Sequence, residues 1–236
     1  MVFAACDPNN KPDNPGGDPE EPEYSAPIVV DGSIDDWARL DQSKVAIAKN
    51  SRDGAWDGVN EMRVYADEYF VFYYIEYNNA VVSDLLASAG ETLPMRINLN
   101  TDGEFSSGYA NYFLQSYDFI IEIQLAEEGK WINSGGTLHQ RVGSDWNELA
   151  GPSSGLVSCA GNGNKVEIVL VREIFDNAVA ASESASPLGD VFQTSLRFYE
   201  TSSTGKWEEL SNIPNGNITE DNPDGYGKLL EVTTVK

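Results

Sequence analysis

Aromatic side chains in polar loops are the first candidates for chemistry in this sequence. Trp56 lies between two glycines in the loop 50–58 and is followed by Asp57, so few apolar partners are near it in sequence. A flat ring flanked by hydrogen-bonding groups suits the apolar face of a pyranose and its hydroxyls. The alternative is that Trp56 covers a sheet edge. Three further aromatic candidates are Trp146, Tyr109 and Tyr112. The remaining tryptophans, Trp37, Trp131 and Trp207, are expected to pack in the fold.

A second group of candidates consists of oxygen-bearing side chains near Gly103. Asn98, Asn100 and Asp102 stand at alternate positions before this glycine, as ligands do in the first half of a Ca²⁺ loop. The segment is not an EF-hand, because Tyr109 stands where the bidentate glutamate would be. The predicted ligands of a structural Ca²⁺ are Asn100, Asp102, Asp118 and Glu122. The alternative is that these side chains cap their own turn.

Residues for catalysis are sparse. His139 is the only histidine and is expected in a strand. We therefore predict neither a zinc site nor a pair of haem ligands. Cys159 is expected to be a buried, inert thiol. A hydrolase that uses two surface carboxylates stays open as an alternative, because the separation of such a pair is not visible in sequence. We therefore predict a non-catalytic protein.

The charge balance narrows the choice of partners. Among 236 residues, 15 Lys and Arg stand against 38 Asp and Glu, a formal charge of -23. Such a chain repels nucleic-acid phosphates and anionic headgroups, so we expect no nucleic-acid partner and contact with a membrane only through a lipid anchor. Neutral ligands such as sugars, and divalent cations, remain compatible with this charge.

Short alternating or apolar runs separated by Gly, Asn, Asp and Ser predict an all-β fold from residue 26 to 236. We expect one antiparallel β-sandwich, jelly-roll or immunoglobulin-like, with a few short helices. The predicted strands are 44–49, 61–66, 69–77, 95–99, 117–125, 165–171, 191–199 and 229–235. The predicted helical segments are a turn capped by Asp35 and the ranges 80–89 and 172–181. The stretches 50–60 and 201–227 are predicted to be long loops.

The N-terminus predicts where the protein works. Residues 1–6, ending in Cys6, resemble the end of a bacterial lipoprotein signal, with Phe3 at a position usually held by leucine. By this resemblance Cys6 carries a lipid. The segment 7–25 is rich in proline and acids and poor in apolar residues, which predicts a disordered, extended linker. An acidic run after such a cysteine resembles the export signal of Bacteroidetes surface lipoproteins. We expect a protein exposed on the cell outer membrane.

Several segments together resemble family 9 carbohydrate-binding modules and the related DOMON-like domains. The opening pairs a strand ending in Asp31-Gly32 and a turn carrying Trp37 with a later Asp67-Glu-Tyr69 hairpin. Further segments follow in the order those domains use, namely 98–103, 107–109, 117–118, 145–146 and 164–168. The resemblance covers roughly residues 27–171 and implies a β-sandwich that binds a polysaccharide or oligosaccharide, with bound Ca²⁺ as a common feature.

The leading prediction is therefore a non-catalytic, cell-surface glycan-binding lipoprotein. A structural or adhesion module that binds protein or cell-wall partners is the alternative. Exposure of Trp56 and Trp146 at one rim favours sugar binding, and burial of both favours the structural module.

Overall fold

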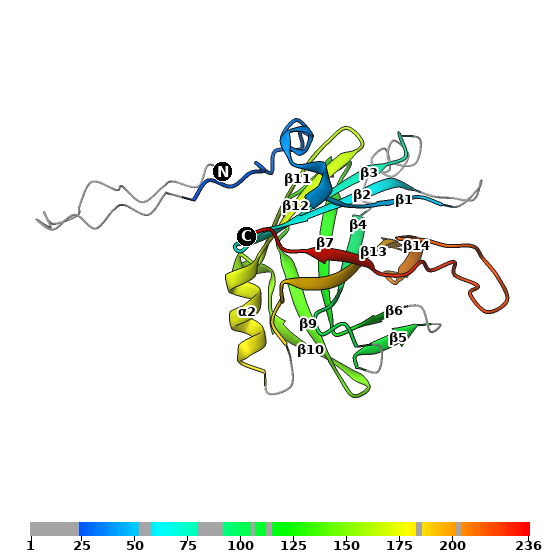
Figure 1. Cartoon of the computed structure of the whole chain (residues 1–236). Helices are drawn as coiled ribbons and strands as arrows, with labels where there is room; N and C mark the ends of the chain where they lie inside the picture. Colours follow the sequence, from blue (N-terminus) through cyan, green and yellow to red (C-terminus); the bar gives the residue numbers. More distant parts are fainter. Residues whose placement is uncertain are drawn as a thin grey trace, which may run out of the picture.

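The fold is an antiparallel β-sandwich, as predicted, with few helices (Figure 1). The computed structural model describes residues 24–51, 58–79, 92–104, 107–111, 115–182, 186–201 and 204–236. The predicted lipidation site Cys6 and nearly all of the predicted linker 7–25 lie outside these ranges. None of the helices in the described part of the chain has the length and apolarity needed to cross a membrane.

One layer is a five-stranded sheet with the order β1-β2-β3-β12-β11, all neighbours antiparallel. Its strands are β1 (Ala46–Lys49), β2 (Val59–Ala66), β3 (Phe70–Tyr77), β11 (Val157–Asn162) and β12 (Lys165–Val171).

The other layer is an eight-stranded sheet with the order β10-β9-β7-β4-β13-β14, in which β15 also pairs with β13 and β8 with β7. Its strands are β4 (Thr92–Asn100), β7 (Phe119–Glu127), β8 (Lys130–Trp131), β9 (Gly136–Val142), β10 (Asp145–Ala150), β13 (Val191–Thr201), β14 (Trp207–Ile213) and β15 (Leu230–Thr233). A separate hairpin of β5 (Tyr109–Asn111) and β6 (Gln115–Tyr117) lies beside this sheet (Figure 1).

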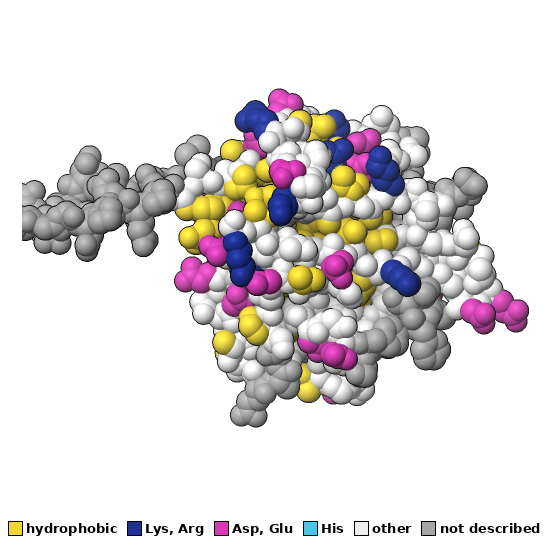
Figure 2. Space-filling model, viewed as in Figure 1, with side chains coloured by type: hydrophobic (Ala, Val, Ile, Leu, Met, Phe, Trp, Pro, Cys, Tyr) yellow, Lys and Arg dark blue, Asp and Glu magenta, His cyan; other side chains and the backbone are white. Residues whose placement is uncertain are grey.

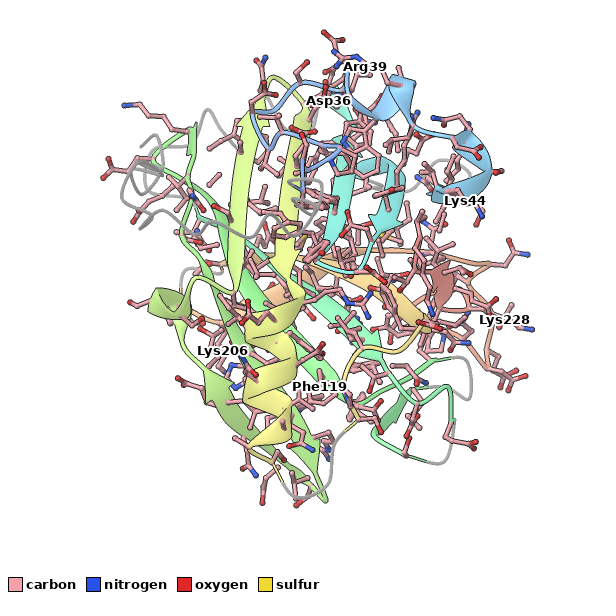
Figure 3. The ribbon with its side chains drawn as sticks, turned by 60° about the vertical axis from the view of Figure 1, so that its left-hand side comes forward. Asp36, Arg39, Lys44, Phe119, Lys206 and Lys228 are labelled. Atoms are coloured by element: carbon pink, nitrogen blue, oxygen red, sulfur yellow. The ribbon has the colours of Figure 1, made fainter. Side chains whose placement is uncertain are left out.

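The core fills the space between the sheets because each strand turns alternate residues inward. In β7, Phe119, Ile121, Ile123 and Leu125 belong to the main core, as the alternation predicted. Helix α2 (Arg172–Ala180) follows β12 and matches the predicted range 172–181. Its Phe175 packs edge-on against Phe119, with ring centroids 5.2 Å apart, and Phe119 is labelled beside the helix in Figure 3.

The outer face of the five-stranded sheet is closed by the N-terminal segment. Phe72 and Tyr74 of β3 point away from the main core and are buried against Trp37 and the segment around it. The Glu167 carboxylate of β12, on the same face, accepts hydrogen bonds from Trp37 Nε1 at 2.8 Å and Gly32 N at 2.7 Å. The Asp-Gly and Trp elements of the opening motif therefore hold this layer in place.

Gly32 is required at its position for two reasons. Its φ is +83°, a conformation that L side chains rarely adopt, and a Cβ there would lie 3.0 Å from backbone atoms of the β11 end. The turn after it is a 3-10 turn, Trp37–Arg39. The prediction that Asp35 caps this turn is wrong, because Asp36 precedes it and uses its carboxylate for Val29 N and for Arg39. Figure 3 shows Asp36 and Arg39 together on this segment.

The prediction that 201–227 is one long loop is wrong, because β14 occupies Trp207–Ile213. Its sequence, WEELSNI, has little apolar alternation, and its outward positions carry aromatic and acidic side chains. The other strands outside the predicted ranges are β5, β6 except for Tyr117, β8, β9, β10 and β11. Of these, only the strand around His139 was expected, without bounds. The predicted helix 80–89 lies outside the described residues.

Candidate binding face on the eight-stranded sheet

The outer face of the eight-stranded sheet carries polar and aromatic side chains. In β9, Leu138 and Gln140 point inward and are buried, whereas His139 and Arg141 point outward. In β4, Arg96 and Asn98 stand outward between core residues. We call this surface the outer face of the eight-stranded sheet.

One aromatic group lies at the β10 edge of this face and is called the Trp146 cluster: Trp146, Tyr109, Tyr117 and Arg141. Trp146 and Tyr117 are stacked, with centroids 6.1 Å apart and an interplanar angle of 18°. Tyr109 lies 6.2 Å from Trp146 and 5.4 Å from Tyr117. The Arg141 guanidinium carbon lies 5.3 Å from the Tyr109 ring centroid and 5.4 Å from that of Trp146, in cation–π range. The β5–β6 hairpin thus brings two tyrosines onto the cross-strand pair Trp146–Arg141.

A second group lies at the β14 edge and is called the Trp207 cluster: Trp207, Tyr199 and Arg96. The two rings are 5.7 Å apart, and the Arg96 guanidinium carbon lies 5.1 Å from the centroid of Tyr199 and 5.4 Å from that of Trp207. Trp207 is 37% exposed, so part of its side chain is open to solvent. Trp207 therefore packs, as predicted, but against Tyr199 and Arg96 at the surface and not in the core. Trp37 and Trp131 do pack against other residues, as predicted.

Between the two clusters stands a charged centre. Arg96 donates from Nε and Nη2 to Glu122 Oε1, at 2.9 and 2.7 Å. The other Glu122 oxygen lies 3.5 Å from His139 Nε2. The side chains of Arg96 and Glu122 are 33% and 27% exposed, so both can still bond to a ligand. Ile120, buried between them and the Trp146 cluster, provides an apolar floor.

Arg197 of β13 contacts side chains from β6, β14 and the segment around Tyr226. Its guanidinium carbon lies 4.4 Å from the ring centroid of Tyr226 and 5.4 Å from that of Tyr117. Its Nη1 is 3.6 Å from Glu209, whose carboxylate accepts a 3.0 Å hydrogen bond from the Tyr226 hydroxyl. Burial raises the pKa of Glu209, and the opposing effect of the Arg197 charge does not cancel it. A hollow of about 230 Å³ opens beside this group, lined among others by Asn212 and Asp224.

The predicted ligand-binding residues divide into two sets. The structure brings Trp146 and Tyr109 together on one surface, where both rings are accessible in part. Trp56, Asp57 and Tyr112 lie outside the described residues. Tyr117, Tyr199 and the three arginines of the face were missed, because sequence alternation shows that they point outward but not that they share one face.

Of the predicted Ca²⁺ ligands, the structure brings some together and places others apart. Asp102 and Asp118 come together, since Ser107 Oγ lies 2.9 Å from Asp102 Oδ2 and 3.3 Å from Asp118 Oδ1. Burial and the Asp102 charge raise the pKa of Asp118. Asn100 Oδ1 accepts from Gly103 N at 2.7 Å, and Glu122 lies with Arg96, roughly 13 Å along β7 from Asp118. Within the described ranges no three His, Cys, Asp or Glu side chains form a group that could hold a metal ion.

The two residues considered for catalysis lie apart. Cys159 is buried and free in β11, as predicted, and burial raises the pKa of its thiol to about 11, so it is protonated at neutral pH. His139 lies in β9, as predicted, on the opposite sheet.

Comparisons with known proteins give distant structural likenesses only. No protein-family model and no curated protein matches the chain. Similar solved structures include a family 9 carbohydrate-binding module from Caldicellulosiruptor kristjanssonii in complex with cellotriose, at 16% identity and a TM-score of 0.42, covering 89% of this chain and 90% of that one. A second, a family 9 module from the same organism in complex with glucose, has 14% identity and a TM-score of 0.40, covering 90% of this chain and 93% of that one.

Proposed function

We propose that this protein is a non-catalytic carbohydrate-binding protein and that the outer face of the eight-stranded sheet is its binding surface. The observation that carries the proposal is the arrangement of the Trp146 and Trp207 clusters, one at each edge of the face, with the charged centre between them. Aromatic rings take the apolar faces of sugar rings, and planar charged groups bond to hydroxyls. Both kinds of group are present, half-buried and held by their neighbours.

The spacing of the clusters favours an extended ligand. Trp146 is on β10 and Trp207 on β14, and these two strands are five strand-to-strand steps, roughly 24 Å, apart across the sheet. A single sugar ring cannot contact both. We therefore propose that an oligosaccharide or polysaccharide lies across the strands and contacts both clusters.

The test is a glycan-binding screen followed by calorimetry on the best ligand. Trp146→Ala and Trp207→Ala should each lower the affinity about tenfold or more, because a stacked aromatic ring contributes on the order of 1 to 2 kcal/mol. Tyr69→Ala is the matched control, since Tyr69 is also exposed, on the five-stranded side of the molecule. Unchanged affinity in both tryptophan variants would reject this face as the binding surface.

A second candidate function, a module that binds a protein partner, is favoured by a different surface. A hollow of about 330 Å³ is lined by Tyr24, Tyr65, Tyr69 and residues near the C-terminal end of the described chain. Tyr24 and Tyr69 are 41% and 50% exposed with ring centroids 4.3 Å apart. Figure 2 shows hydrophobic side chains gathered where the N-terminal segment joins the sandwich. Loss of partner binding in Tyr69→Ala, with glycan binding intact, would support this function.

We further propose that Cys6 carries a lipid and that the segment 7–25 holds the sandwich away from the outer membrane of a Bacteroidetes-type cell. The sequence 1–6 and the acidic, proline-rich composition that follows support this proposal. Mass spectrometry of the protein purified from its native membrane should find acyl chains on Cys6. Release of Cys6→Ser into the soluble fraction is expected, and its retention in the membrane would contradict the proposal.

A further inference from the structure

A group of buried polar side chains lies next to the charged centre of the face. Arg197 on β13 is directly opposite Asn212 on β14, and Asn98 is two residues from Arg96, the partner of Arg197 on β4. Gln115 on β6 donates to the Gly227 carbonyl at 2.8 Å, which brings it beside Tyr226. The name Arg197 chamber is used for these four buried side chains, Arg197, Asn98, Asn212 and Gln115, with the rings of Tyr117 and Tyr226 against the Arg197 guanidinium.

The chamber contains polar atoms without partners. Its four side chains are at most 7% exposed. Among the described residues nothing accepts from Arg197 Nε or Nη2, and nothing donates to Asn98 Oδ1, Asn212 Oδ1 or Gln115 Oε1. Each buried, unmatched polar atom costs on the order of 1 to 3 kcal/mol, so such atoms are rare unless something else pairs with them.

The unmatched atoms define the ligand that would satisfy them. Nε and Nη2 form one edge of the guanidinium, and this edge matches the two oxygens of a carboxylate. The Glu209 carboxylate is near Nη1 of Arg197, so the edge formed by Nε and Nη2 has no partner. The three amide oxygens can only accept, so they require hydroxyl or N–H donors. A molecule that has one carboxylate and several hydroxyls supplies both.

We infer that the Arg197 chamber binds the carboxylate-bearing unit of an acidic saccharide, a uronic acid. The inference rests on the proposed function and names its ligand class. Two charges near the chamber support it. Arg96, which is paired with Glu122, is directly opposite Arg197 and places a second guanidinium beside the chamber. Arg141 has no carboxylate partner among the described residues, so a second acidic unit can pair with it.

Access requires that Tyr226 moves. Its ring covers the Arg197 guanidinium at 4.4 Å and also lines the hollow of about 230 Å³. The hydrogen bond from its hydroxyl to Glu209 holds the ring in this position. Rotation of the Tyr226 side chain would join the hollow to the chamber. The chain's charge of -23 opposes an anion, but at physiological salt charges more than about 8 Å away are largely screened.

The experiment compares acidic oligosaccharides with their methyl esters, which keep the hydroxyls and add only a methyl group but carry no charge. The probes are trimers of galacturonic, mannuronic and glucuronic acid, titrated into the full chain by calorimetry. At least one acid should bind about tenfold or more tightly than its ester, the effect of a charge-assisted pair. Equal or weaker binding of all three acids would overturn the inference.

Variants assign the effect to the chamber. Arg197→Lys keeps the charge but loses the planar edge, and it should remove most of the preference for acid over ester. Tyr226→Phe keeps the ring and frees it from Glu209, and it should strengthen acid binding about threefold. Arg39→Gln, an exposed arginine on the other layer, is the control and should change nothing. Thermal unfolding reports whether each variant is folded, and Tyr226→Phe keeps the test open if Arg197→Lys is not.

Failure of the inference differs from failure of the proposed function. Glycans that bind with no preference for acid, and lose affinity in Trp146→Ala and Trp207→Ala, would leave the proposed function standing and reject the uronic acid. Absence of binding to any acidic or neutral glycan would reject both.

Discussion

The outer faces of the two sheets differ in how far a glutamate carboxylate is buried and hydrogen-bonded. On the five-stranded sheet, Glu167 is fully buried and takes three hydrogen bonds, from Trp37 Nε1 and from the backbone N–H groups of Asp31 and Gly32. On the eight-stranded sheet, Glu122 stays partly exposed with Arg96 and His139 around it. The first face is closed by the chain itself and its polar groups are matched. The second keeps unmatched groups and exposed rings, which supports the proposal that it binds a ligand.

The largest expected effect is on the closed face. Glu167→Ala leaves three donors without an acceptor, two of them buried, so it should lower the free energy of unfolding by about 3 kcal/mol. Glu122→Ala, on the open face, should cost less than about 1 kcal/mol. Urea denaturation of both variants measures the difference. Equal costs would break the contrast between the two faces.

Calcium is the next test, because the predicted site lies in the loops beside the open face. If Asp102 and Asp118 hold Ca²⁺, addition of the ion at about 100 times its dissociation constant should stabilise the protein by about 2.7 kcal/mol. The gain should vanish in Asp118→Asn. A melting temperature unmoved by calcium after chelator treatment would count against the metal.

The pH dependence should reveal the buried carboxylates of both layers. Burial raises the pKa of Glu167, Glu209, Asp118 and Asp176 above their unfolded values. A raised folded pKa adds stability that is complete below the unfolded pKa and is lost as the pH rises through the folded pKa. The melting temperature should therefore fall as the pH rises from about 4, the unfolded pKa of Asp and Glu, toward neutral pH. Glu167→Gln and Glu209→Gln should each reduce the slope, and a stability that rises with pH over this range would contradict the assignment.

The smallest expected effect concerns the exposed ring. Trp207→Phe should change the free energy of unfolding by less than about 0.5 kcal/mol, because the side chain is on the surface. Trp37→Phe, which loses the hydrogen bond to buried Glu167, should cost on the order of 2 kcal/mol. Chemical denaturation separates the two. A large loss at Trp207 would indicate a structural role for the Trp207 cluster.

Strands with strong alternation were predictable, and those without it were not. The range 165–171 is identical to β12, and the two faces of β7 follow its alternation. In contrast, β10 and β14 carry mostly polar side chains, including buried Ser211 and Asn212 in β14, so no periodic apolar signal marks them. These two edge strands carry Trp146 and Trp207, so the sequence signal was weakest where the candidate site is.

The sequence by itself determined the fold class, because period-two alternation of apolar residues is compatible with little else than paired strands with one buried face. It also identified Trp146 and Tyr109 as candidates, since aromatic residues in polar surroundings lack a place in the core. Only the tertiary structure decided which residues form one surface. Arg96, Arg141 and Arg197 come from three strands, and their rings come from a hairpin, an edge strand and a late loop. Strand order and the cover over each face depend on contacts between segments about 100 residues apart, which no local pattern encodes.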